Sequence, residues 1–163
     1  MTAPAARRPA ADDPGVPLAR LFAMAYRMLV DGLHEGLAER GWTDVRPAFG
    51  FVLLALRAGP ASLRDLPGAL GTSKQAVSKL VEAMVAAGYV ERAADPADAR
   101  AKLVQLSGRG RALLAVVEEI YAELEAGWVR SLGAAGLTRL RGDLERVLRA
   151  AHGGALPAVR TVG

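Results

Sequence analysis

The clearest hydrophobic pattern in the chain is an apolar stripe of helical spacing near its middle. Its members lie at i, i+3, i+4, i+7 and i+8: Val77, Leu80, Val81, Met84 and Val85. This spacing predicts an amphipathic helix with one face turned to the core. Thr72, with Gln75 three residues on, has the spacing of a capping box and is expected to begin the helix. Gly88 suits the left-handed position that ends it.

A β-hairpin is predicted directly after this helix. Residues 89–92 begin a strand, and residues 102–106 alternate as a returning strand. The intervening Ala-Asp-Pro-Ala-Asp segment combines turn formers with a proline that cannot continue a ladder. A helix followed by such a hairpin is the winged-helix arrangement. In that arrangement the helix enters the major groove of DNA and the hairpin tip reaches the minor groove.

Helical spacing also predicts the elements before and after this unit. Residues 18–40 form a long amphipathic helix, and residues 46–57 form a second. Residues 62–70 are expected to be the first helix of a helix-turn-helix, short or distorted because Pro67-Gly68 lies inside it. After the hairpin, a long helix passes through Trp128 and a final helix starts at about Leu137.

The predicted fold class is therefore mainly α with a small β-hairpin wing. A single domain is expected over residues 18–152, with the winged helix-turn-helix at about 44–107 and dimerisation helices at 18–40 and 108–152. The terminal helices carry more apolar surface than so small a winged domain covers, so we expect them to pair with a second copy of the chain. Residues 1–17 are predicted to be a disordered arm and residues 153–163 a loose tail.

The composition limits the partners. The 163 residues carry a net charge of +4, with eight basic and five acidic residues between Pro60 and Arg111. A moderately basic winged segment suits a nucleic-acid partner. The chain has no cysteine, which excludes disulfides and Cys-ligated zinc. No apolar run has the length of a membrane span or a signal-peptide core, so we expect a cytoplasmic protein without membrane contact.

The face of the central helix turned away from the core carries short donors and cations. These are the candidate DNA-binding residues of the helix: Ser73, Lys74, Gln75, Ser78 and Lys79. A cation in a first helical turn opposes the helix dipole, and a bound phosphate would reverse that penalty. Gln suits adenine, while Ser and Lys can meet several bases or phosphates. The alternative is an ordinary solvated helix face, with Gln75 serving only as the capping partner.

Three consecutive motifs resemble the MarR (multiple antibiotic resistance regulator) family of transcriptional regulators. They are Gly88-Tyr-Val-Glu-Arg92, Asp95-Pro-Ala-Asp98-Ala-Arg100-Ala-Lys102 and Val104-Gln-Leu-Ser107-Gly-Arg-Gly110. The resemblance extends over nearly the whole chain in the order of its elements. It implies a homodimer that binds a pseudo-palindromic double-stranded operator and represses a nearby gene. It also implies release of the DNA by a small, often aromatic or anionic, ligand. Pro67-Gly68 departs from the helix-favouring residues that the family typically keeps there.

The wing of that family carries an Asp-x-Arg-x-Lys pattern, which Asp98, Arg100 and Lys102 match. Arg100 is expected to enter the minor groove, where narrow A·T-rich tracts concentrate negative potential. Asp98 would orient it, and Lys102 would meet phosphate. The alternative is an exposed Asp–Arg pair at a loop tip, which contributes roughly 0–1 kcal/mol and has no function.

Three ring-bearing residues lie near the expected ligand crevice and are candidate effector contacts: Tyr26, His34 and Trp42. Packing or interface roles are the alternative for each. His34 has no second ligand at a convincing spacing, so we expect no metal site and no cofactor.

Catalysis finds no support in the sequence. The two histidines are isolated, and no glycine loop has phosphate-cradling spacing. We therefore predict a non-enzyme. The main alternative to a DNA-binding regulator is a winged-helix module that binds protein and leaves DNA alone. Arg100 and Lys102 beside a cationic helix favour DNA.

Overall fold

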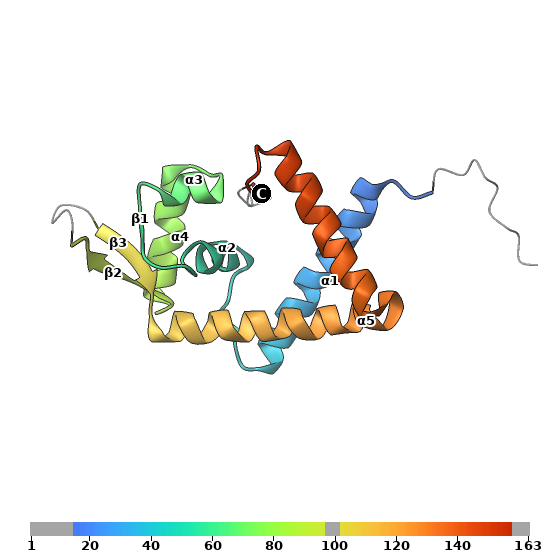
Figure 1. Cartoon of the computed structure of the whole chain (residues 1–163). Helices are drawn as coiled ribbons and strands as arrows, with labels where there is room; N and C mark the ends of the chain where they lie inside the picture. Colours follow the sequence, from blue (N-terminus) through green and yellow to red (C-terminus); the bar gives the residue numbers. More distant parts are fainter. Residues whose placement is uncertain (1–14, 97–101, 158–163) are drawn as a thin grey trace, which may run out of the picture.

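The computed structural model describes residues 15–96 and 102–157, and it is built mainly of helices (Figure 1). The elements follow in this order: α1 (Leu18–Glu39), α2 (Pro47–Ala55), β1 (Ala61–Ser62), α3 (Leu66–Leu70), α4 (Lys74–Ala86), β2 (Val90–Ala94), β3 (Lys102–Leu106) and α5 (Gly108–Ala151). A mainly helical fold with a small wing, as the sequence predicts, is confirmed.

The wing is a three-stranded antiparallel sheet in the order β1-β3-β2. The alternation of residues 102–106 predicts a returning strand, and β3 covers these residues. In the hairpin, Val90 pairs with Leu106 and Ala94 with Lys102. The short strand β1 joins the other edge of β3 through Ala61 and Val104. The sequence does not predict β1, because two residues are too few to show an alternating pattern.

Helix α4 begins one residue later than the capping-box spacing predicts. Ser73, not Thr72, is the N-cap: its backbone is extended, and its Oγ accepts a hydrogen bond of 3.2 Å from the Ala76 amide. The helix ends at the predicted place, because Gly88 has φ +76°, a conformation that favours glycine.

Helix α3 covers only the second half of the predicted segment. Pro67 lies in its first turn, where an N–H group has no helical partner to lose. Ser62, which was expected to lie in the helix, pairs in β1 instead. The proline therefore shortens the helix without kinking it.

The two helices predicted after the hairpin are both present; they meet at a kink and together carry the label α5. Gly133 has φ 70° and ψ 159°, far from helical values. We call residues 108–132 the first arm and residues 134–151 the second arm. Figure 1 shows the first arm running from the wing to the far end of the molecule, where the chain turns back. The second arm thus begins about three residues before the predicted Leu137.

The core lies where α2, α4, the wing and the first arm of α5 meet. Phe49, Val52, Val81 and Leu113 are each at most 1% exposed there. By contrast, a set of large apolar side chains on α1 and α5 is exposed: Leu18, Leu21, Phe22, Met24, Tyr26, Met28, Leu132, Val147 and Leu148. Within residues 15–96 and 102–157, no helix is both long and apolar enough to cross a membrane.

Candidate nucleic-acid interface

Helix α4 turns one face to the core and the opposite face to solvent. Val77, Val81 and Met84 are fully buried. At about 100° per residue, Gln75 and Lys79 then lie on the opposite side of the helix, and both are exposed. The structure thus exposes Gln75 and Lys79, two of the residues predicted from the sequence, on the side of α4 away from the core.

The start of α4 favours an anion. No acidic residue lies in its first turn, where Lys74 is exposed. Ser73 is exposed as well, although its Oγ already accepts the capping hydrogen bond and keeps only its hydroxyl proton to donate. Free N–H groups, the positive end of the dipole and two lysines on one helix make a surface that attracts phosphate.

A carboxylate also lies on this surface, which the sequence analysis did not single out. The Ser78 hydroxyl donates a hydrogen bond of 3.3 Å to Glu82, and the Arg92 guanidinium lies 4.0 Å from the same carboxylate oxygen. Arg92 belongs to β2, so this contact joins the central helix to the wing. The i, i+4 spacing of Ser78 and Glu82 is a signal that could have indicated the first contact.

Part of the predicted wing contact lies within the described structure. Lys102 is exposed at the start of β3, opposite Ala94, at the end of the hairpin nearest the tip. Asp98 and Arg100 lie outside the described residues.

A polar cluster at the base of the wing, which we call the junction cluster, consists of Trp42, Asp44, Tyr89 and Arg109. The Tyr89 hydroxyl donates to Asp44 Oδ1 at 2.5 Å. Arg109 Nη2 donates to Asp44 Oδ1 and Oδ2 at 3.1 and 3.0 Å and to the Tyr89 oxygen at 3.2 Å. The guanidinium carbon lies 4.8 Å from the centre of the Tyr89 ring and 5.6 Å from that of Trp42, within cation–π range.

These contacts shift the titration of the junction cluster. The hydrogen bond from Tyr89 and the positive charge of Arg109 hold the pKa of Asp44 below its usual value of 3.8, although partial burial opposes them. Burial raises the pKa of Tyr89 above 10.0, and its hydrogen bond to Asp44 adds to the effect. The cluster is therefore an ionised carboxylate and guanidinium joined by a neutral phenol at neutral pH.

The three candidate effector residues have different surroundings. Trp42 belongs to the junction cluster, with its ring centre 6.1 Å from that of Tyr89. Tyr26 is 53% exposed on α1. Burial raises the pKa of Tyr121, and the electrostatic effect of Tyr26 adds to it. His34 is half-buried on the same helix.

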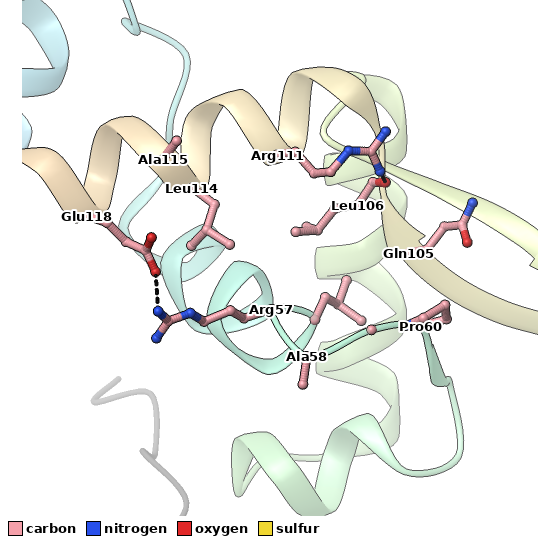
Figure 2. Close-up of a pocket in the computed structure, with 11 residues that line it drawn as sticks. Arg57, Ala58, Pro60, Gln105, Leu106, Arg111, Leu114, Ala115 and Glu118 are labelled. Carbon is pink, nitrogen blue, oxygen red and sulfur yellow. Dashed lines mark hydrogen bonds and ion pairs between the residues drawn. The ribbon is translucent and has the colours of Figure 1, made fainter.

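A cavity of about 340 Å³ lies between the end of α2, strand β3 and the first arm of α5 (Figure 2). Its walls include Leu56, Arg57, Leu106, Arg111, Leu114 and Glu118. Arg57 forms an ion pair of 2.9 Å with Glu118, and Arg111 donates to the Leu106 carbonyl oxygen at 2.7 Å. None of the three effector residues predicted from the sequence lines it. Among the described residues, no group of three or more acidic or histidine side chains could hold a metal ion.

A short helix, a turn, an exposed cationic helix and a hairpin with a third strand together define a winged helix-turn-helix protein. The model of the MarR family matches residues 50–101 of the chain, the part that contains these elements. This segment is thus similar to the MarR family, which the three sequence motifs resemble.

Solved structures show the same similarity over most of the chain. Wild-type MarR from E. coli, without ligand, is 27% identical with a TM-score of 0.65, over 82% of this chain and 97% of that one. A mutant of the same protein in complex with operator DNA is 27% identical with a TM-score of 0.66, over 82% and 94%. The regulator Tm0710 from Thermotoga maritima shares the fold at 23% identity and a TM-score of 0.61, over 85% and 98%. A search of curated proteins found no match.

Proposed function

We propose that this protein is a homodimeric, sequence-specific DNA-binding regulator that represses transcription and releases DNA when a small molecule binds. The observation that carries the proposal is the exposed surface of α4, with Lys74, Gln75 and Lys79, next to a wing whose strand β3 begins with Lys102. The E. coli relative bound to operator DNA supports it, because the two chains share 27% of their residues over most of their length.

In this proposal, Gln75 and Ser78 meet base edges in the major groove, and Lys74 and Lys79 meet phosphate. Arg100 reaches the neighbouring minor groove, oriented by Asp98, and Lys102 holds phosphate. Each winged unit reads one half-site. The two half-sites lie about one helical turn apart, because a two-fold dimer presents two equivalent helices.

The salt dependence of DNA binding tests this arrangement. Lys74→Ala with Lys79→Ala removes about four phosphate contacts from a dimer, and each contact contributes about 0.9 to the slope of log K against log salt. We expect the slope between about 50 and 200 mM salt to fall by about 3.6. Arg130→Ala with Arg139→Ala, two exposed cations of α5, is the control with the same loss of charge and should keep the slope.

An unchanged slope in the lysine variant would place DNA elsewhere on the molecule. Absence of binding to any duplex, even at low salt, would instead favour the protein-interaction module.

The cavity between α2 and α5 supports the effector part of the proposal. Its volume of about 340 Å³ is at the lower end of ligand sites, and it combines leucine walls with two guanidinium groups. An aromatic carboxylate could replace Glu118 as the partner of Arg57.

We expect a panel of aromatic carboxylates to contain one that releases bound DNA. Arg57→Gln should lose that response while keeping affinity for DNA. Tyr26→Ala and His34→Ala test the effector residues predicted from the sequence in the same assay.

A further inference from the structure

The chain enters and leaves its winged unit, α2 to β3, through two connections that meet at the junction cluster. The first connection is the segment between α1 and α2, which carries Trp42 and Asp44. The second is the passage from β3 into α5, where Arg109 is the second helical residue. Tyr89 lies between them, directly after the glycine that ends α4. One cluster thus links both connections to the end of the DNA-facing helix.

Backbone contacts already fix Tyr89 to the start of α5. The Ser107 amide donates to the Tyr89 carbonyl oxygen at 3.1 Å, and the Ser107 hydroxyl donates to the Gly88 carbonyl oxygen at 2.6 Å. The same hydroxyl oxygen caps α5 by accepting from the Gly110 amide. Among the described residues, no backbone hydrogen bond joins the first connection to this point. Its link to Tyr89 and Arg109 passes through the side chains of Asp44 and Trp42.

The polar part of the cluster contributes little to the core. The Tyr89 ring is fully buried, but the side chains of Arg109 and Asp44 are 49% and 48% exposed. Ion pairs of that exposure stabilise a fold weakly. Charge-assisted hydrogen bonds between three groups nevertheless specify one geometry, since each donor and acceptor has a fixed direction. These groups are therefore better suited to fixing an orientation than to supporting stability.

We infer that Asp44, Tyr89 and Arg109 are positioning residues that hold the winged unit at one orientation to α1 and α5, and thereby set the half-site spacing that the dimer accepts. This inference rests on the proposed function, because spacing has meaning only for a dimer that reads two half-sites. The rotation of each winged unit about its two connections determines the separation of the two α4 helices.

A series of operators whose half-sites are moved one or two base pairs apart or together tests the inference. The native protein should prefer one spacing. Asp44→Asn and Tyr89→Phe keep side-chain size and should weaken that preference about three- to tenfold, which corresponds to the net contribution of one ordinary hydrogen bond. Asp143→Asn is the matched control, because Asp143 pairs with Arg146 at 2.5 Å on α5, away from both connections. It should leave the preference unchanged.

A distance measurement without DNA separates this inference from the proposed function. The chain has no cysteine, so two introduced cysteines are the only sites that a thiol-reactive spin label can modify. We place them at Ala76→Cys on α4 and Asp31→Cys on α1. Excess unlabelled protein restricts the signal to distances within one chain. Asp44→Asn should broaden the distribution of distances, whereas Asp143→Asn should not.

The outcomes are distinct. An equally narrow distribution and the same spacing preference in Asp44→Asn and the native protein would overturn the inference. A native protein that binds no duplex would overturn the proposed function, and the distance distribution would then decide alone whether the cluster fixes the orientation.

Discussion

Two glycines at the start of α5 have the same residue type but opposite surroundings. A Cβ atom on Gly110 would lie 1.9 Å from the Tyr89 carbonyl oxygen, a backbone atom that cannot rotate away. A Cβ atom on Gly108 would meet nothing within 4 Å. Gly110 therefore allows α5 to approach the end of α4, while Gly108 only begins the helix.

We expect Gly110→Ala to lower the free energy of unfolding by about 3 kcal/mol or more, because the helix must move away from Tyr89. Gly108→Ala should instead raise it by about 0.4–1 kcal/mol through the reduced entropy of the unfolded chain. Urea unfolding followed by circular dichroism measures both. Equal stability of the two variants would show that α5 does not approach Tyr89 this closely.

The titration of Tyr89 predicts a loss of stability at alkaline pH. Burial, aided by Asp44, raises the pKa of this phenol in the folded state above 10.0, its value in the unfolded chain. The folded state then holds a proton that the unfolded state has released. Stability is therefore complete below about pH 10 and falls as the pH rises toward the folded pKa.

Tyr89→Phe should remove part of this alkaline loss in thermal unfolding curves. Tyr121→Phe should remove a further part, since burial raises the pKa of Tyr121 as well. If Tyr89→Phe unfolds with the same alkaline dependence as the native protein, the phenol is not in the environment described.

On the acid side, the lowered pKa of Asp44 predicts stability that is present above about pH 3.8 and lost below it.

For single residues, the sequence predicts those features that depend on neighbours along the chain. The solvent-facing Gln75 and Lys79 follow from helical periodicity, and the left-handed Gly88 follows from its place after the last apolar residue of the stripe. The junction cluster does not, because Asp44 lies 45 residues before Tyr89 and Arg109 lies 20 residues after it. Only the fold brings such partners together. The cap was placed on Thr72 rather than Ser73 because adjacent hydroxyl residues offer nearly the same spacing.

Among the helices and strands, too, the sequence predicts those set by local pattern and misses those set by contacts between distant residues. Long periodic stretches predict α1, α4 and the first arm of α5 within a few residues. Strand β1 was missed because its two residues gain their extended form by pairing with β3. The sequence predicts a break between Trp128 and Leu137, but it does not indicate which residue carries it. A glycine in a helical pattern is compatible with both a helix and a bend.

The bend at Gly133 gives a prediction for α5. With φ 70° and ψ 159°, Gly133 occupies a region that L-residues rarely adopt. We expect Gly133→Ala to cost about 1–3 kcal/mol, or to straighten α5 and separate its second arm from the rest of the molecule. Gly142→Ala, in the same arm and in open space, should be neutral or stabilise by up to about 1 kcal/mol.

Thermal unfolding and the radius of gyration in solution measure the two responses to Gly133→Ala. A variant that keeps both the native melting temperature and the native radius would mean that the bend does not need glycine.

For the whole molecule, the apolar stripe of α1 is the feature that the single chain leaves unexplained. Leu33 and Leu37, in its second half, are buried against the core. Phe22 lies on the same side as Leu33, three turns earlier, but it is 46% exposed. Leu18 is 68% exposed on that side as well. A stripe that continues beyond the surface covering it is expected to meet another surface, and a second copy of the chain offers the same stripe.

Replacing one residue of this stripe tests the dimer directly. In a two-fold interface each substitution occurs twice, and burial of one phenylalanine contributes about 1.5–3 kcal/mol. Phe22→Asp should therefore raise the dissociation constant of the dimer at least about 10²–10⁴-fold. Arg27→Asp, an exposed residue on the opposite side of α1, changes the charge more and should leave the dimer intact. Analytical ultracentrifugation measures both.

Because two linked winged units bind DNA more tightly than one, Phe22→Asp should also lose operator affinity. A dimer that withstands Phe22→Asp would place the interface on another surface.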